Sequence, residues 1–326
     1  MSPTMTGPIL GTKSRPDNLT LAAFFFLVLI GGSNAVAVRF SNLELPPFWG
    51  AATRFLATSL VFWAIILARR ISIPAGRALM GTLLYGVLAI GASYAFIYWG
   101  ILSIKASLAM IILALGPLLT MLFAVAHRLE PFQWRGLVGA LTALAGIMLA
   151  VGQELGTSIP LLSLLALLAG AACIAEGSVV FKLFPRTHPT ATNAIATTTG
   201  AVILILVSIL VRESWLLPTT STTWAAFTYL VFIGSVILFY LYLLVLSRWT
   251  ASATSYAFLL FPVATIIIAA WLSHEVVTSR FLAGGFIVIA GVWIGALQQP
   301  GRRRDSEEPL HKTALERANP PRPGCA

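Results

Sequence analysis

The chain alternates between long apolar blocks and short polar or turn-rich breaks. Each block holds about 20 residues, which as a helix covers a hydrocarbon layer of about 30 Å. Lipid offers no partner to backbone groups, so such blocks must be helical. The alternating pattern of a membrane β-barrel is absent. The blocks predict ten transmembrane helices, at 21–39, 48–68, 78–100, 106–126, 132–152, 160–181, 190–211, 223–246, 252–272 and 280–297.

The composition supports this all-α integral membrane class. Of 326 residues, 58% are hydrophobic and only 10% are charged, whereas soluble proteins contain about 25% charged residues. The lipid bilayer is therefore an expected partner, and the net charge of +10 need not indicate a nucleic acid. Cys173 and Cys325 have no metal-ligand spacing, and no Gly-rich phosphate loop appears. No metal or other cofactor is expected.

Lysine and arginine residues are distributed unevenly over the breaks between blocks. If the N-terminus lies in the cytoplasm, ten helices return the C-terminus there too. The cytoplasmic side then carries thirteen Lys and Arg residues, and the opposite side carries four: Arg39, Lys105, Arg212 and Arg280. Cytoplasmic loops are enriched in these residues. The count predicts a multi-pass protein of the plasma (inner) membrane with both termini in the cytoplasm.

One stretch of the sequence occurs twice. Residues 115–130, LGPLLTMLFAVAHRLE, resemble residues 260–275, LFPVATIIIAAWLSHE, so that Pro117 aligns with Pro262 at a shift of 145 residues. Over 106–151, twelve of the 46 positions are identical to those 145 residues later, against about 10% expected by chance in a sequence of this composition. The shift also brings the weak, Thr-rich seventh block onto the second, which supports a helix there.

The repeat divides the chain into two halves of five helices. Because five is odd, the second half must enter the membrane from the opposite side, and an inverted repeat of this kind is typical of carriers that work by alternating access. The predicted organisation is an N-terminal cytoplasmic segment (1–20), two five-helix repeats (21–152 and 158–298) and a Pro-rich, charged, disordered tail (299–326).

Several motifs resemble the EamA-type branch of the drug/metabolite transporter superfamily. They are the Gly-Ser-Asn turn at 32–34, Arg54 in the second block, and a fourth block with Pro117 that ends in Glu130. The resemblance covers roughly residues 20–298. It departs at Ile30, where the family often has tryptophan, and at Thr199, which replaces Arg54 in the second repeat. The resemblance implies a ten-helix exporter of amino acids or related small metabolites with a central cavity.

Two prolines and one acid inside the blocks are candidate working parts. Pro117 and Pro262 each remove a backbone hydrogen bond in a helix interior, which predicts either a hinge and cavity-shaping bend or a static kink. Glu176 is the only acid well inside a block. A carboxylate at that depth usually has a partner or water, so Glu176 is either a proton-coupling group or a side chain that reaches the nearby cytoplasmic interface.

Polar and aromatic side chains supply the candidate substrate site. Arg54 either binds a substrate carboxylate or caps loose carbonyls between helices, and Asn34 is either a ligand or interhelical glue. Tyr94 and Tyr98 share a helix face, and Tyr229 and Tyr240, eleven residues apart, are expected to share another. Tyrosine suits a cavity for amphipathic cargo. The complete set of candidate cavity residues is Asn34, Arg54, Tyr94, Tyr98, Tyr229, Tyr240 and Tyr256.

Other features that recur in the two halves favour structural roles. Glu130 and Glu275 are expected to lie at the positive ends of the helices that follow them. The fifth and tenth blocks carry small-residue spacings that allow close helix packing, within one chain or between subunits, so a homodimer is compatible with the sequence. The small-residue positions are Gly136, Gly139, Gly146, Gly284, Gly291 and Gly295.

These sequence features favour a transporter over an enzyme. An enzyme is disfavoured because His127, His188, His274 and His311 all fall in loops or the tail. A secondary active exporter of amino acids or related metabolites fits best, with a drug or multidrug carrier of the same fold as the alternative. A passive channel stays open as a different class. The expected partner is a small-molecule substrate.

Overall fold

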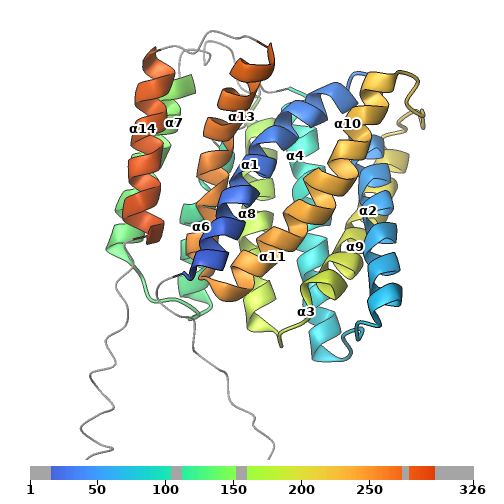
Figure 1. Ribbon diagram of the computed structural model, residues 1–326, viewed down its shortest axis with the longest axis horizontal. Coiled ribbons are helices and arrows are strands. Elements are labelled where there is room, and N and C mark those ends of the chain that lie inside the picture. Colours follow the sequence, from blue (N-terminus) through green and yellow to red (C-terminus); the bar gives the residue numbers. More distant parts are fainter. Residues whose placement is uncertain (1–15, 104–111, 152–159, 274–278, 298–326) are drawn as a thin grey trace, which may run out of the picture.

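The computed structural model describes residues 16–103, 112–151, 160–273 and 279–297, and all regular structure in these ranges is helical. Figure 1 shows the helices side by side, with α7 and α14 at one edge and α2 and α9 at the other. The α-helices are α1 (Asn18–Ser41), α2 (Pro47–Arg69), α3 (Arg77–Tyr85), α4 (Ser93–Ile101), α6 (Gly116–Ala126), α7 (Trp134–Val151), α8 (Leu161–Leu183), α9 (Pro189–Leu210), α10 (Ser221–Val231), α11 (Leu238–Arg248), α12 (Ala251–Ser255), α13 (Ala257–Ser273) and α14 (Ser279–Val292). The described ranges also contain three π-helices: η1 (Gly86–Ala92), η3 (Phe232–Ile237) and η4 (Trp293–Leu297).

These elements form the predicted ten spans. Among the described residues, six segments are long and apolar enough to cross a bilayer, and they include the continuous α3–η1–α4 and α10–η3–α11. The four shorter apolar helices belong to the fourth, fifth, ninth and tenth predicted blocks. The Thr-rich seventh block is α9, whose threonines bond to carbonyls of the same helix, as Thr197 does to Asn193. Such internal bonds let polar residues lie inside a membrane helix.

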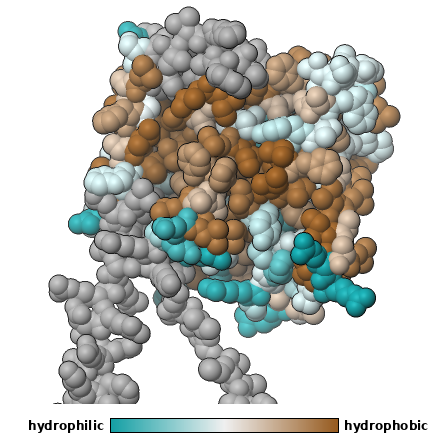
Figure 2. Space-filling view, viewed as in Figure 1, coloured by the Kyte–Doolittle hydropathy of each residue, from teal (hydrophilic) through white to brown (hydrophobic). Residues whose placement is uncertain are grey.

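The two halves run in opposite directions, as the odd helix number requires. α1 begins, and α8 ends, at the lower end of the molecule in Figure 1. Contacts agree with this placement: Arg248 at the end of α11 pairs with Asp17 before α1 at 3.2 Å, and Lys182 at the end of α8 donates to the Trp249 carbonyl at 2.5 Å. The surface shows the same polarity, with hydrophobic residues across the middle and hydrophilic ones gathered along the lower edge (Figure 2).

The small residues of α7 and α14 pack the two helices against each other within the chain. A Cβ on Gly139 would lie 2.6 Å from the Gly291 carbonyl oxygen, and one on Gly146 would lie 2.7 Å from the Gly284 carbonyl oxygen. Glycine therefore allows the two backbones to touch. The glycine spacings of these two helices are explained by contacts inside one molecule.

Two sequence expectations about helix ends are wrong. Pro117 does not lie in a helix interior: the chain turns at 114–115, and Pro117 is in the first turn of α6, where proline costs no hydrogen bond. Pro262 lies inside α13 as expected. Glu130 does not belong to the helix that follows it. Its carboxylate accepts the Ala251 N–H at 2.7 Å and so caps α12 from the other repeat. Glu275 lies outside the described residues.

Candidate functional site

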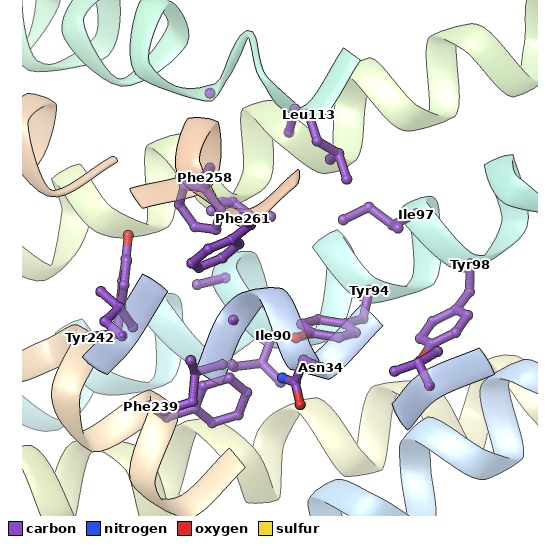
Figure 3. Close-up of a pocket in the computed structure, with 18 of the residues that line it drawn as sticks. Asn34, Ile90, Tyr94, Ile97, Tyr98, Leu113, Phe239, Tyr242, Phe258 and Phe261 are labelled. Carbon is purple, nitrogen blue, oxygen red and sulfur yellow. The ribbon is translucent and has the colours of Figure 1, made fainter. Parts of the chain in front are cut away.

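A cavity of about 290 Å³ lies between the two repeats. Its walls come from α1, α2, α3, η1, α4, Leu113 and the start of α6 in the first repeat, and from α8, α11 and α13 in the second. Figure 3 shows side chains from these helices pointing toward a common centre. The lining residues are Leu27, Gly31, Asn34, Val38, Arg54, Tyr85, Ala89, Ile90, Tyr94, Ile97, Tyr98, Ile101, Leu113, Gly116, Ala171, Ile174, Leu238, Phe239, Tyr242, Phe258 and Phe261.

Equivalent positions of the two repeats line the cavity. Four lining positions of the first half have lining counterparts 145 residues later in the second: Tyr94 with Phe239, Ile97 with Tyr242, Leu113 with Phe258, and Gly116 with Phe261. The two halves therefore contribute equivalent surfaces to one central space, which is where inverted-repeat carriers place their substrates.

Most of this wall is apolar and aromatic. The rings of Tyr94 and Tyr98 lie 6.1 Å apart, from one face of the η1–α4 segment, and Phe55 packs edge-on against Tyr94 at 4.8 Å. At the other end of the cavity, the Tyr242 hydroxyl is 2.6 Å from the Ser178 hydroxyl. Such a surface suits the apolar part of a small ligand.

The polar part of the wall is built around Arg54. This side chain is 2% exposed. Its Nε donates to the Ser235 hydroxyl at 2.7 Å and its Nη2 donates to the Gly234 carbonyl at 2.7 Å. Asn34 donates to the same carbonyl from α1 at 2.8 Å. Neither of the two ion pairs within the described ranges involves Arg54.

The π-helix η3 makes the Gly234 carbonyl available to these side chains. In a regular α-helix the Leu238 N–H would bond to Gly234. Here it bonds to the carbonyl of Ile233, five residues back, as in a π-helix. No pattern in the sequence predicts this π-helix, so Gly234 and Ser235 could not be identified as site residues from the sequence.

Three of the predicted tyrosines do not line this cavity. Tyr229 is hydrogen-bonded to Ser33, and Tyr256 donates to the Gly136 carbonyl at 2.6 Å. Tyr240 is 38% exposed. The expectation that Tyr229 and Tyr240 share a helix face is wrong because η3 lies between them and changes the number of residues per turn.

Glu176 lies away from the cavity, near the lower end of α8, and has a partner that the sequence did not reveal. Its Oε1 is 2.8 Å from Nε2 of His127, which follows the last residue of α6. The Glu176 side chain is 25% exposed and that of His127 39%. The other carboxylate oxygen, Oε2, is buried and has no hydrogen-bond partner within the described ranges. The pair joins the first repeat to the second.

Comparisons with known proteins agree with the two-repeat fold. The model of the EamA-like transporter family matches the chain twice, at residues 18–152 and 161–296. A solved crystal structure superimposes with a TM-score of 0.73 at 20% identity, over 87% of this chain and 98% of that one, which supports the fold alone.

Curated relatives cover nearly the same length. An uncharacterized inner membrane transporter, YedA, of Escherichia coli is 29% identical over 83% of this chain and 89% of its own. A probable amino-acid metabolite efflux pump of Salmonella typhimurium is 26% identical over 82% of this chain and 91% of its own. A probable terminal-alkyne amino-acid exporter of Streptantibioticus cattleyicolor is 28% identical over 72% and 79%.

The family match spans both halves of the chain and leaves only the two tails and the central connection outside. It also explains why the cavity wall repeats at a fixed spacing, and it places the protein among transporters rather than enzymes. The chain is a multi-pass membrane protein that belongs to the EamA-like transporter family.

Proposed function

We propose that this protein is a secondary active exporter of amino acids or related small metabolites and that it works by alternating access. It resides in the plasma membrane with both termini in the cytoplasm, as the distribution of Lys and Arg residues favours. Arg54 binds the carboxylate of the cargo, and the aromatic wall receives its apolar part.

The buried charge of Arg54 carries this proposal. An ionised group taken out of water is costly unless it is paired, and the described residues give Arg54 only neutral acceptors. Nε and one N–H of Nη2 are engaged, so Nη1 and the second N–H of Nη2 are available for a bidentate bond to a carboxylate. An anionic cargo would thus supply the missing counter-charge.

The remainder of the cavity limits the size and character of the cargo. A volume of about 290 Å³ lies at the lower end of ligand cavities, which span about 300–1,000 Å³. The aromatic and aliphatic wall favours a compact apolar group beside the carboxylate. The names of two relatives, which concern amino-acid metabolites and an amino acid, support the same class.

Alternating access is supported by the symmetry of the cavity wall. Two inverted halves can exchange conformations, which gives two half-open shapes of similar energy around one site. Counterflow in proteoliposomes tests the mechanism: a carrier exchanges external labelled L-leucine for internal unlabelled L-leucine and saturates, whereas a channel does neither.

The R54Q variant tests the cargo site. A hydrogen bond to a charged group contributes about 1.5–3 kcal/mol, so R54Q should lower the apparent affinity for L-leucine at least tenfold. R69Q, at the exposed end of α2, is the matched control and should exchange normally. Saturable exchange that is equal in R54Q and R69Q would contradict the carboxylate role.

We extend the proposal to energy coupling through Glu176. A proton on this carboxylate would cancel its charge-assisted bond to His127 and loosen a contact between the two repeats. The neighbouring charged groups Glu130 and Lys182 have partners of their own, on Ala251 and Trp249. Glu176 differs from Glu130 in that its Oε2 is buried and has no hydrogen-bond partner within the described ranges.

Export across an imposed pH gradient tests the coupling. E176Q should lose the dependence of export on the gradient and keep counterflow, because exchange needs no net proton movement. D17N, which removes the exposed carboxylate paired with Arg248 at the same end, is the control. Equal gradient dependence in E176Q and wild type would remove Glu176 from the mechanism.

A further inference from the structure

Two of the π-helices in the described ranges, η1 and η3, occupy equivalent positions in the repeats. η1 spans Gly86–Ala92 and η3 spans Phe232–Ile237, and the shift of 145 residues carries 86–92 onto 231–237. In both, the first residue after the π-helix bonds five residues back: Ser93 to Leu88, and Leu238 to Ile233. Each repeat thereby releases one carbonyl from the α-helical pattern, that of Ala89 in the first and that of Gly234 in the second.

The two repeats satisfy this carbonyl differently. In the first, the Ser93 hydroxyl donates to the Ala89 carbonyl at 2.7 Å, so the helix satisfies itself. In the second, the position of Ser93 is held by Leu238, which has no hydroxyl. The Gly234 carbonyl is instead taken by Asn34 and Arg54 from two helices of the first repeat.

Gly234 leaves room for the Asn34 amide. A Cβ on Gly234 would lie 2.0 Å from Oδ1 of Asn34, so any larger residue there would displace this amide. The amide of Asn34 therefore lies against the Gly234 peptide, with Nδ2 on its carbonyl. At the equivalent position of the first repeat stands Ala89, and no side chain of the opposite repeat is hydrogen-bonded to its carbonyl within the described ranges.

We infer that Gly234 is the positioning residue of the cargo site, and that its carbonyl fixes the Arg54 guanidinium with one edge toward the cavity. This inference rests on the proposed carboxylate site and adds its polarity. Within the described ranges only the second repeat offers such a carbonyl to the other repeat, so the cargo binds in one orientation. Its carboxylate lies at the junction of α1, α2 and η3, and its apolar part lies toward Phe258 and Phe261 of α13.

The L238S variant tests the inference by copying the first repeat into the second. A serine at 238 can donate to the Gly234 carbonyl, as Ser93 does to Ala89, and so competes with Arg54 for it. L238A makes a similar truncation without a donor and is the matched control. The released guanidinium should react at least tenfold faster with phenylglyoxal at Arg54 in L238S than in L238A, as measured by mass spectrometry. Modification of the exposed Arg69 should be equal in both.

A cargo measurement separates this inference from the proposed function. The apparent affinity for L-leucine should fall about tenfold more in L238S than in L238A, while unfolding temperatures of the two variants stay alike. Equal reactivity of Arg54 and equal affinity in both variants would overturn the role of Gly234. Arg54 reactivity that changes as expected in a protein that never binds L-leucine would instead leave the positioning role intact and contradict the cargo class.

A double-mutant cycle gives an independent check. G234A alone should strongly lower the apparent affinity for L-leucine, because its Cβ meets Asn34. G234A combined with N34A should have an affinity no lower than that of N34A alone. An additive loss of affinity in the double variant would show that Gly234 and Asn34 act separately, and would contradict their joint role in the cargo site.

Discussion

Acidic residues at the two ends of the molecule join the repeats through helix N-termini. At the lower end, Glu130 of the first repeat accepts the N–H groups of Ala251 and Ser252 at the start of α12. At the other end, Glu213 of the second repeat accepts the N–H groups of Phe48 and Trp49 at the start of α2. An anion there satisfies orphan donors and faces the positive end of the helix dipole.

The cap at Glu130 gives a prediction for single substitutions. E130A removes Oε1, the acceptor of both bonds, and should lower the free energy of unfolding by about 1–2 kcal/mol. E130Q keeps an acceptor oxygen but loses the charge, so it should lose only about 0.3–1 kcal/mol. Thermal unfolding in detergent measures both. Equal losses in the two variants would mean that charge alone, rather than the hydrogen bonds, stabilises this contact.

Element positions were readable from the sequence, but their internal irregularities were not. Apolar length located all ten spans, and the 145-residue shift identified α9 in spite of its threonines. The π-helices gave no signal because they depend on packing between distant helices, such as that of Gly86 against the Ala196 backbone. Because the sequence does not predict η3, Tyr240 was wrongly expected in the cavity wall and Gly234 was not expected at the site. The Glu176–His127 and Glu130–Ala251 contacts join residues of different helices, which periodicity within a helix cannot reveal.

The two repeat-related prolines should behave differently, because only Pro262 lies inside a helix. P262A supplies the N–H that proline lacks and removes the clash of its ring with the Phe258 carbonyl, which should move Phe258 and Phe261 in the cavity wall. We expect higher thermal stability and at least fivefold slower L-leucine counterflow in P262A. P117A, in the first turn of α6, should change neither property by more than about twofold in rate or 1 kcal/mol in stability. Similar behaviour of the two variants would indicate that transport does not depend on a proline inside α13.

At the scale of the whole molecule, the inverted repeat determines which loops lie on the same side of the membrane. Arg77 begins α3 and Arg248 ends α11, one in each repeat, and both elements meet the lower end in Figure 1. Contacts also place these two ends together with the end of α8. Gly81 of α3 packs against Phe184 after α8, and Lys182 of α8 bonds to Trp249 after α11. Arg212, after α9, belongs to the opposite end.

Labelling from one side of the membrane tests this arrangement together with the orientation. Single cysteines at Arg77, Arg248 and Arg212, all exposed, would be introduced into a variant that lacks Cys173 and Cys325. A membrane-impermeant maleimide added to intact cells should label R212C alone, and inside-out vesicles should reverse the pattern, because the side rich in Lys and Arg faces the cytoplasm. If R77C and R248C were labelled from different sides, the two five-helix halves could not be inverted copies. A cavity shared by them, and exchange of its opening between the two faces, would then lose its structural basis.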